Sequence, residues 1–388
     1  MTFQHFGLKL IEPKFGSDLT NLIIELDYLR KKPLMGSTHP KIFFQLKEVF
    51  HFLESLGSAR IEGNRTTVAE YIETKIEDRK STKEDLVEIQ NVEQALEFID
   101  ENIKDQKIDR SFLSEIHKIT VNNLTLPPQG EGSRHPGEFR KENVKIKGAK
   151  HTPPEQIKVP EYMEELFNFI ETDNEAKYDL IKTALAHHRF AWIHPYDNGN
   201  GRVVRLLTYA MLVKQGFKVN MGKRIINPTA IFCNDRNKYN NALSKADDGT
   251  EAGLLNWCNY VLSGLKNEIE KIDKLLDYSY LSKEILVPSV DFALDRKVIT
   301  SVEADILLVA IRKEVFQASD IQHLLKDKIP AARSRFIRQL REKRLIEPEN
   351  HNSRKHVINF RNSYLLRGII KMLDEKGFLP IKNETKEL

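Results

Sequence analysis

The chain has 388 residues, of which 30% are charged and 40% apolar, and a formal net charge of +4. This length predicts two or three domains, and the composition is that of a globular protein, which excludes a largely disordered chain. The modest charge predicts no global affinity for nucleic acid, and no segment approaches the roughly 18 apolar residues of a membrane span. Two cysteines, Cys233 and Cys258, exclude a disulfide framework. We therefore expect a cytoplasmic protein without membrane contact.

The first 150 residues predict helices followed by a small flap. Apolar residues recur at helical spacing over 42–56, so residues 1–80 are interpreted as a helical N-terminal region. Two amphipathic helices are expected over 83–104 and 109–122, and a loop rich in proline and glycine follows them. The alternating stretch Asn143-Val-Lys-Ile-Lys-Gly predicts a hairpin strand, and hence a β-flap within an otherwise helical domain.

The middle of the chain predicts a helical domain over residues 81–290. Apolar residues three and four apart indicate core helices over 160–170 and 177–193, and the next helix is expected over 203–214. The helical pattern continues over 235–246 and 254–276. It weakens at Leu286-Val-Pro-Ser, which we interpret as a linker to a boundary near 290–300.

The last quarter has the pattern of a winged helix over residues 295–365. Three short helices are expected over 302–312, 318–326 and 330–343, and a hairpin over 345–350 and 355–360. Residues 366–388 then form a C-terminal helix or tail. The predicted fold class is therefore mainly α, with a helical bundle, a small β-hairpin flap and a C-terminal winged helix-turn-helix domain.

The stretch His194-Pro-Tyr-Asp-Asn-Gly-Asn-Gly-Arg-Val-Val-Arg carries the clearest chemistry in the chain. Gly199, Asn200 and Gly201 lie where one predicted helix ends and the next begins, so their backbone N–H groups and the helix dipole can hold an anion. Arg202 and Arg205 are three residues apart and can hold adjacent phosphates. The imidazole of His194 is suited to take a proton from an attacking hydroxyl.

This stretch resembles the signature of the Fic family, which is a histidine, a proline, an aromatic residue, two variable positions, Gly-Asn-Gly-Arg, two variable positions and an arginine. The resemblance implies the transfer of AMP from ATP to a Ser, Thr or Tyr hydroxyl of a target protein, the chain itself among the candidates. It also implies that Val144 and Ile146 lie in a flap that binds the target by strand addition. Tyr239 falls where similar proteins line the nucleotide site, and the likeness spans about 50–270.

One position departs from the family pattern. Fic AMP transferases usually carry Asp or Glu directly before Gly-Asn-Gly, where the carboxylate holds Mg²⁺ against the phosphates, and this chain has Asn198 there. An amide oxygen can ligate magnesium without bringing charge, so we expect weaker binding of the ion. Asp197 carries a charge one residue earlier, and it either substitutes or faces solvent.

Residues Ser58-Ala-Arg-Ile-Glu62-Gly63-Asn64 resemble the inhibitory motif of the same family. The spacing of four places Ser58 and Glu62 on one helix face, and Gly63 is a natural end for that helix. In similar proteins this glutamate pairs with the second arginine of the signature, here Arg205. The resemblance therefore implies autoinhibition and predicts that Glu62→Gly raises activity.

The third predicted helix of the winged-helix region is rich in arginine, and it predicts either DNA binding or a dimerisation or protein-docking role. Two functions follow for the whole chain. One is a protein adenylyltransferase that uses ATP. The alternative is a DNA-binding regulator whose Fic domain senses nucleotide. The basic residues are Arg333, Arg335, Arg338, Arg341, Lys343 and Arg344, with Arg354 and Lys355 in the expected wing.

Overall fold

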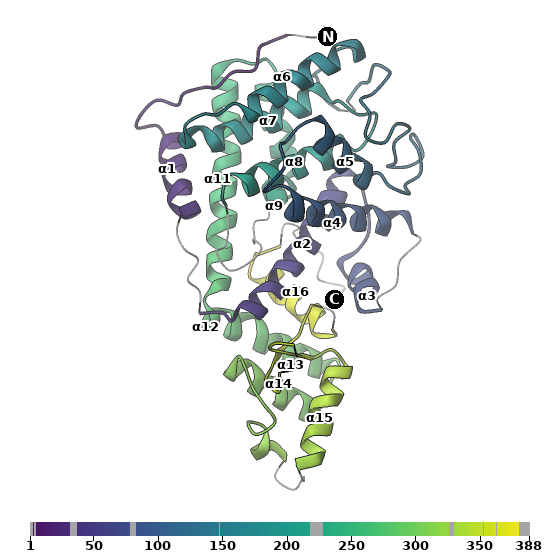
Figure 1. The fold of residues 1–388 in the computed structure, drawn as a ribbon, viewed down its shortest axis with the longest axis vertical. Coiled ribbons are helices and arrows are strands. Elements are labelled where there is room, and N and C mark those ends of the chain that lie inside the picture. The colour runs from purple at the N-terminus through teal and green to yellow at the C-terminus, as the bar shows by residue number, and fades with distance from the viewer. Residues whose placement is uncertain are drawn as a thin grey trace.

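The computed structural model describes residues 3, 5–31, 37–77, 83–146, 148–217, 228–325, 330–351, 353–361 and 363–379. These residues are mainly helical, and they form a larger unit and a smaller one, which lie one above the other in Figure 1. The larger unit contains α1 (Asp18–Lys31), α2 (Pro40–Glu62), α3 (Val68–Glu77), α4 (Glu84–Asn102), α5 (Arg110–Thr120), α6 (Val159–Glu171), α7 (Asp179–Ile193), α8 (Asn200–Lys214), α9 (Pro228–Cys233), α10 (Arg236–Ala246) and α11 (Glu251–Leu276). The chain continues with α12 (Tyr278–Leu281), a π-helical turn (Ser282–Leu286), α13 (Val287–Asp295), α14 (Ser301–Lys313), a 3-10 turn (Gln322–Leu325), α15 (Pro330–Glu342), β1 (Ile346–Pro348), β2 (His356–Ile358) and α16 (Leu365–Glu375).

Helix α8 runs through the centre of the larger unit and is buried along nearly its whole length. It packs against α7, α4 and α5, and α6 packs on the other side of α7. Apolar residues cover most of its faces, and Val203, Leu207 and Ala210 are fully buried, as expected for a central helix. The expected core helices over 177–193 and 203–214 are therefore confirmed, and the loop between α7 and α8 is held at both ends by rigid elements.

The flap differs from its prediction. Residues 143–146 belong to no strand or helix, and Lys147 lies outside the described residues. The alternating pattern reports which side chains face inward, whereas a strand also needs a hydrogen-bonded partner, which 143–146 do not have. A turn follows, in which Ala149 N–H donates to the carbonyl of Ile146 (3.2 Å) and Gly148 has a φ of +79°. The hairpin prediction is thus wrong for 143–146, which form no strand.

The linker predicted at Leu286-Val-Pro-Ser is helical instead. A π-helical turn ends at Leu286, and α13 follows directly with Pro288 in its first turn. Proline is tolerated there because the N–H that it lacks would have no partner within the helix. Leu286 and Val290 are fully buried in a core that extends from α2 to α16. The chain therefore crosses the predicted boundary as packed helix.

The smaller unit follows the expected order of elements with one exception. Helices α14 and α15 lead into β1 and β2, which pair antiparallel with Ile346 opposite Ile358. Phe316 forms an isolated bridge to His356 beside this pair. The second expected helix, over 318–326, is instead a 3-10 turn from Gln322, because few residues anchor it: Ile321 and Leu325 are buried in this segment, and residues 326–329 lie outside the described part. The winged-helix assignment stays a prediction.

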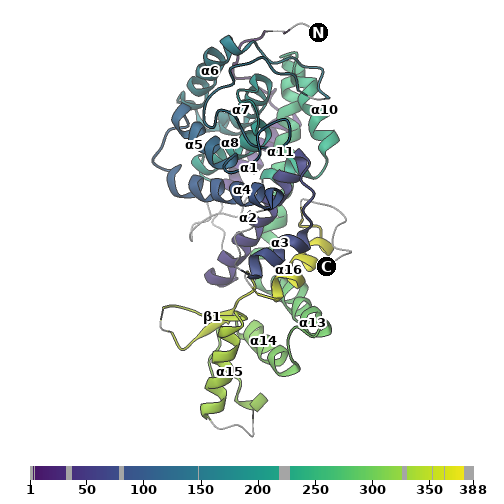
Figure 2. The same ribbon diagram turned by 90° about the vertical axis from the view of Figure 1, so that its right-hand side faces the viewer.

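Helix α2 belongs to both units. Its first half packs against the hairpin, where Gln45 Nε2 donates to the carbonyl of Ile358 (2.8 Å) and Phe360 N–H donates to Gln45 Oε1 (2.9 Å). Its second half packs against α4, α8 and α9. Helix α16 lies against α13 and α3, as Figure 2 shows, so the two ends of the chain share one core. Residues 1–80 and 366–379 are therefore not separate packing units.

Candidate functional site

The motif loop joins α7 to α8 through two residues in the left-handed region. His194 ends α7 with a φ of +52°, and its N–H still donates to the carbonyl of Phe190 (3.0 Å). Gly199 has a φ of +75° and precedes the first residue of α8. A non-glycine residue is uncommon in this region, so the conformation of His194 is held by its surroundings. The loop thus turns sharply between His194 at the end of α7 and Asn200 at the start of α8.

Asn200 and Tyr196 fix the shape of this loop. Tyr196 N–H donates to Asn200 Oδ1, and Asn200 Nδ2 donates to the carbonyl of Tyr196, both at 2.9 Å. The ring of Tyr196 is buried and stacks on His117 with ring centroids 3.8 Å apart. We predicted that Asn200 binds nucleotide, and in this structure its side chain forms hydrogen bonds within the loop itself.

His117 supports the loop from α5 and was not found from the sequence. Gly137 N–H donates to His117 Nδ1 (2.8 Å), so Nε2 carries the proton and donates to the carbonyl of Asn198 (3.1 Å). Burial lowers the pKa of His117 to about 4, which keeps the ring neutral. No spacing relative to the motif could have indicated it, because its link to Asn198 spans 81 residues.

His194 is half-buried, and burial lowers its pKa to about 4, with a hydrogen bond to the backbone of Ala191 acting in the opposite direction. Its imidazole is therefore neutral at pH 7 and has a free electron pair to accept a proton. Arg140 holds the backbone at this point, because its Nε donates to the carbonyl of His194 (2.9 Å) and its N–H donates to the carbonyl of Pro195 (2.8 Å). The backbone on both sides of the His194–Pro195 bond is thus held by Arg140.

Arg205 is engaged by the end of α2, as the resemblance implies. Its Nε donates to Ser58 Oγ (2.9 Å), and its Nη2 donates to the carbonyl of Ser58 (2.8 Å) and to Glu62 Oε1 (2.9 Å). Burial alone would raise the pKa of Glu62, but the charge of Arg205 and its hydrogen bond lower it below the ordinary value. Helix α2 ends at Gly63, whose φ is +114°. The predicted helix end and the predicted partner of Arg205 are both present.

The Glu62 carboxylate also lies against the first turn of α8. A side chain added at Gly201 would collide with it, so only glycine leaves room for this contact. The first turn of a helix exposes unpaired N–H groups and the positive end of the helix dipole. A carboxylate therefore stands at the position where a phosphate would be bound.

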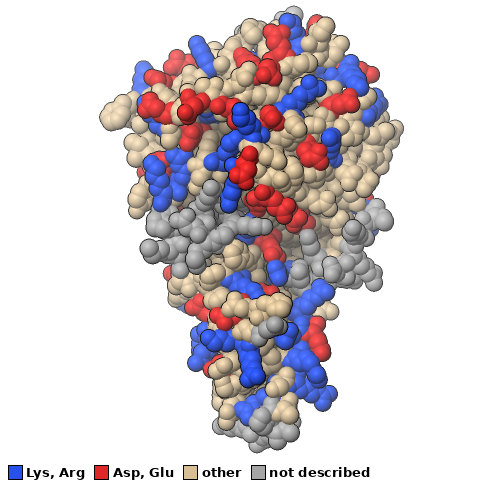
Figure 3. All heavy atoms as spheres, viewed as in Figure 1, with Lys and Arg blue, Asp and Glu red and all other residues tan. Residues whose placement is uncertain are grey.

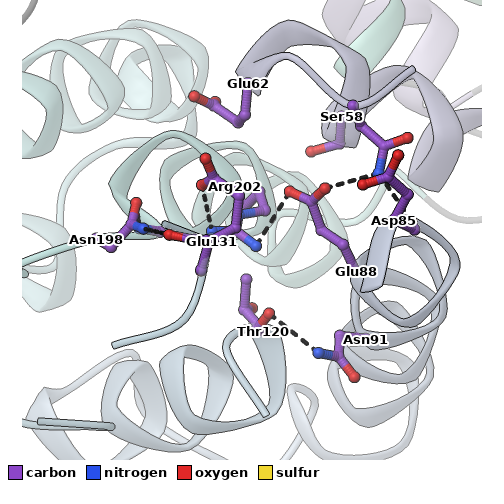
Figure 4. Close-up of polar contacts among 12 residues, drawn as sticks. Ser58, Glu62, Asp85, Glu88, Asn91, Thr120, Glu131, Asn198 and Arg202 are labelled. Atoms are coloured by element: carbon purple, nitrogen blue, oxygen red, sulfur yellow. Dashed lines mark hydrogen bonds and ion pairs between the residues drawn. The ribbon is translucent and has the colours of Figure 1, made fainter. Parts of the chain in front are cut away.

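Arg202 is held by two further carboxylates that the sequence did not indicate. Its Nη1 lies 3.1 Å from Glu88 of α4, and its Nη2 lies 3.1 Å from the carboxylate of Glu131 and donates to the carbonyl of Glu131 (2.7 Å). Figure 4 shows the two glutamates reaching Arg202 from different elements, with Glu62 nearby. Burial raises the pKa of Glu88 to about 7 and also raises that of Glu131.

The residues before Gly199 do not present a free carboxylate. Asp197 accepts hydrogen bonds from Ser133 Oγ (2.5 Å) and Arg134 N–H (2.8 Å), so in this conformation it anchors the preceding loop. Asn198 Oδ1 accepts from Gly199 N–H (2.8 Å). Within the described residues, no three His, Cys, Asp or Glu side chains form a cluster suited to a metal ion. This conformation does not fit the Mg²⁺ expected at Asn198.

Tyr239 lies in the core next to α7. It is 5% exposed, and its hydroxyl contacts His187 Nε2 (2.9 Å), while His187 Nδ1 contacts Thr208 Oγ1 (2.7 Å). His187 is thus a buried histidine that joins α7 to α8 and α10. The neighbouring His188 is also buried and contacts Asp247 (3.1 Å). In this structure the Tyr239 side chain packs in the core. Its predicted role in lining the nucleotide site stays a prediction.

Val144 and Ile146 lie at the flap and are both half-buried. They are on the segment that precedes the turn at Gly148, and Arg140 ties this segment to the motif through its Nη1, which donates to the carbonyl of Glu142 (2.9 Å). In the described part of the chain, no helix is both long and apolar enough to cross a membrane.

Comparison with known proteins identifies the family of the central domain. The pattern of the Fic/DOC family matches residues 107–212, which include the motif loop and the flap. A protein adenylyltransferase Fic of Drosophila yakuba is 28% identical over 209 residues, which are 52% of this chain and 38% of that protein. A probable protein adenylyltransferase of Aquifex aeolicus is 35% identical over 120 residues, 31% of this chain and 33% of that protein. The chain thus spans less than half the length of these relatives.

Solved structures agree on the fold. A Fic family protein from Desulfovibrio desulfuricans matches 92% of this chain and 98% of its own with a TM-score of 0.55 at 17% identity. A signaling protein with a Fic domain from Bacteroides thetaiotaomicron matches 66% of this chain and 97% of its own with a TM-score of 0.52 at 20% identity. At these identities the likeness concerns the fold alone.

Proposed function

Because this chain carries a Fic/DOC domain, we propose that it is a protein adenylyltransferase that moves AMP from ATP to a hydroxyl of a protein. The observation that carries the proposal is the neutral His194 imidazole at the start of the loop that leads into α8, whose first turns carry Arg202 and Arg205. The names of the relatives support the same activity.

In the proposed reaction His194 acts as the general base. It accepts the proton of a Ser, Thr or Tyr hydroxyl, whose oxygen attacks the α-phosphorus of ATP. The bond between the α-phosphorus and the bridging oxygen breaks, and pyrophosphate leaves. The backbone of Gly199, Asn200 and Gly201 together with Arg202 and Arg205 stabilises the charge of the phosphates. The modified residue comes from a target protein or from this chain.

The described conformation corresponds to an inhibited state in this proposal. Glu62 neutralises Arg205 and occupies the first turn of α8, so a triphosphate would meet a carboxylate where it needs N–H donors. Its γ-phosphate would be displaced and the α-phosphate misaligned for in-line attack. Activation would therefore require the end of α2 to withdraw.

Magnesium enters the proposal only as an expectation. The oxygen atoms of Asp197 and the Oδ1 of Asn198 are already hydrogen-bonded within the loop, so the site would have to rearrange before it could ligate the ion. We derive no step through the metal.

The proposal is tested by incubating Glu62→Gly protein with each nucleoside triphosphate labelled at the α-phosphate and measuring label on protein. We expect label from ATP to exceed that of the wild type. The matched control is Glu62→Gly combined with His194→Ala, in which label should be lost. Transfer that persists without His194 would refute the mechanism, and transfer from another nucleotide would refute the donor.

A second function is favoured by the basic surface of α15. Arg335, Arg338 and Arg341 are exposed on this helix, and Figure 3 shows Lys and Arg side chains prominent on this part of the smaller unit. Such a surface matches the charge of a nucleic-acid backbone. We propose duplex DNA as its partner. Dimerisation through this unit and a cytoplasmic location stay predictions.

DNA binding is tested by retention of the full chain on immobilised duplex DNA. Retention should fall as the salt concentration rises, and it should be lower for Arg335→Glu/Arg338→Glu than for the wild type. Equal retention of the variant and the wild type would refute DNA binding by this surface.

A further inference from the structure

Arg202 is restrained as firmly as Arg205, although by different elements. Its side chain is fully buried between Glu88 of α4 and Glu131 of the loop that follows α5 (Figure 4). Its Nη1 lies 3.1 Å from Glu88 Oε1, yet Arg202 Nη1 and Nε and Glu88 Oε1 form no hydrogen bond. The contact with Glu88 therefore acts through charge and leaves two N–H groups of Arg202 without an acceptor.

Glu88 is also tied to the segment that carries Glu62. Asn64 Nδ2 donates to Glu88 Oε2 (2.7 Å) and to the carbonyl of Asp85 (2.8 Å), which joins the end of α2 to the first turns of α4. Asn64 N–H donates to the carbonyl of Ala59 (3.3 Å), so the same turn that ends α2 orients this amide. A displacement of Glu62 with α2 would carry Asn64 away from Glu88.

The charges around the two arginines favour the closed arrangement over a bound nucleotide. Three carboxylates, those of Glu62, Glu88 and Glu131, surround the guanidinium groups of Arg202 and Arg205. When all three are ionised, which for Glu88 requires a pH above its raised pKa of about 7, negative charge exceeds positive charge by one, in a region partly shielded from water where electrostatic interactions are stronger than in bulk solvent. A triphosphate entering this region would be repelled until some of these carboxylates are withdrawn or neutralised.

We propose that Glu88 is a second inhibitory residue, which holds the Arg202 guanidinium on α4 and away from the phosphates, and that Asn64 couples it to the inhibitory turn of Glu62. This inference rests on the proposed adenylyl transfer. It makes Glu88 a positioning residue, because it acts on the nucleotide through Arg202. Release of the end of α2 then frees Arg205 and removes the Asn64 hydrogen bond that fixes Glu88 beside Arg202.

The test compares Glu62→Gly with Glu62→Gly/Glu88→Gln. Glutamine keeps the size of the side chain and removes its charge. We expect the KM for ATP in self-labelling to fall about tenfold while kcat changes less, because the loss of one buried carboxylate partner is typically a change of a decade or more. The Kd of a non-hydrolysable ATP analogue, measured by calorimetry, should fall by the same factor. The matched control is Glu101→Gln in the same background, an exposed carboxylate near the other end of α4, and it should change neither constant.

Two further variants keep the outcome decisive. Asn64→Ala removes the hydrogen bond to Glu88 without changing a core residue. We expect it to lower the Kd of the ATP analogue by a smaller factor than Glu88→Gln does. This variant therefore tests the proposal even if Glu88→Gln fails to fold. Glu88→Asp retains the charge and should return the Kd toward that of Glu62→Gly.

A Kd or KM that is unchanged or higher in Glu62→Gly/Glu88→Gln would overturn the proposal, since Glu88 would then be neutral or would help Arg202 to bind phosphate. If Glu62→Gly binds the analogue but transfers no label, the proposed function fails and the Kd comparison still decides on Glu88. If none of these variants binds the analogue, both proposals fall.

Discussion

Replacing Glu62 with glutamine keeps the shape of the side chain and removes the charge that pairs with Arg205. The two groups are 2.9 Å apart, and the side chains of Arg205 and Glu62 are 2% and 28% exposed. Because a glutamine oxygen still accepts a hydrogen bond, the loss is the charge-assisted part of the interaction, about 1.5 kcal/mol. We expect the free energy of unfolding to fall by this amount. Because Glu62 and ATP compete for Arg205, we expect the affinity for ATP to rise by roughly tenfold.

The assay combines the initial rate of self-labelling with α-labelled ATP below its KM and the melting temperature without nucleotide. We expect the rate to rise about tenfold and the melting temperature to fall by roughly 2 °C, with Glu101→Gln as the control for both. The opposite signs separate inhibition from general damage, which would lower both. A folded variant that melts earlier but labels no faster would refute the reasoning, because Glu62 would then stabilise the fold without controlling nucleotide.

Three other predictions follow from the geometry. Changing His194 to Ala in the Glu62→Gly background should slow transfer by at least roughly a hundredfold, the usual contribution of a general base, while calorimetry shows ATP still bound; transfer at an undiminished rate would contradict the role of the imidazole. Burial raises the pKa of Glu88 from 4.5 to about 7, so the folded protein keeps a proton that the unfolded chain loses in this interval, and the contribution of Glu88 to stability should fall as pH rises through it, by on the order of 3 kcal/mol. His117 and His194, whose pKa values burial lowers to about 4, act in the opposite direction, so the measurement is the difference in urea unfolding between the wild type and Glu88→Gln, and we expect this difference to shift against the wild type between pH 5 and pH 7.5; an unchanged difference would contradict the burial of Glu88. Replacing Ile146 with Asp should reduce transfer to a protein target and leave the Kd of ATP unchanged, and a normal rate of target labelling would argue against the flap.

The motif loop was predictable because its signals are local. A histidine, a proline and two glycines within eight residues determine where α7 stops and α8 starts, and the buried helices on each side show helical periodicity. The end of α2 was predictable for the same reason, because Gly63 adopts the left-handed conformation that ends a helix. In these cases the residues that decide the structure are neighbours in the chain.

The residues around Arg202 were not predictable, because nothing local marks them. Glu88 and Glu131 lie 114 and 71 positions from Arg202, and a glutamate on an amphipathic helix is ordinarily a solvated one. The strand predicted over 143–148 was wrong for a different reason, since its local alternation of side chains is clear but no neighbouring strand pairs with 143–146. The linker predicted at Leu286-Val-Pro-Ser was wrong for a third reason. Proline ends helices but is also common in their first turn, which is where Pro288 lies in α13.

Helix α2 is 23 residues long, which corresponds to a rod of about 35 Å. A rod of this kind transmits a tilt or a shift from one end to the other, because bending it would break its backbone hydrogen bonds. One end is fixed to the hairpin through Gln45 and the other carries Ser58 and Glu62. Linkage is reciprocal, so whatever moves the hairpin relative to the larger unit changes the affinity for nucleotide, and nucleotide changes the affinity for that agent by the same factor.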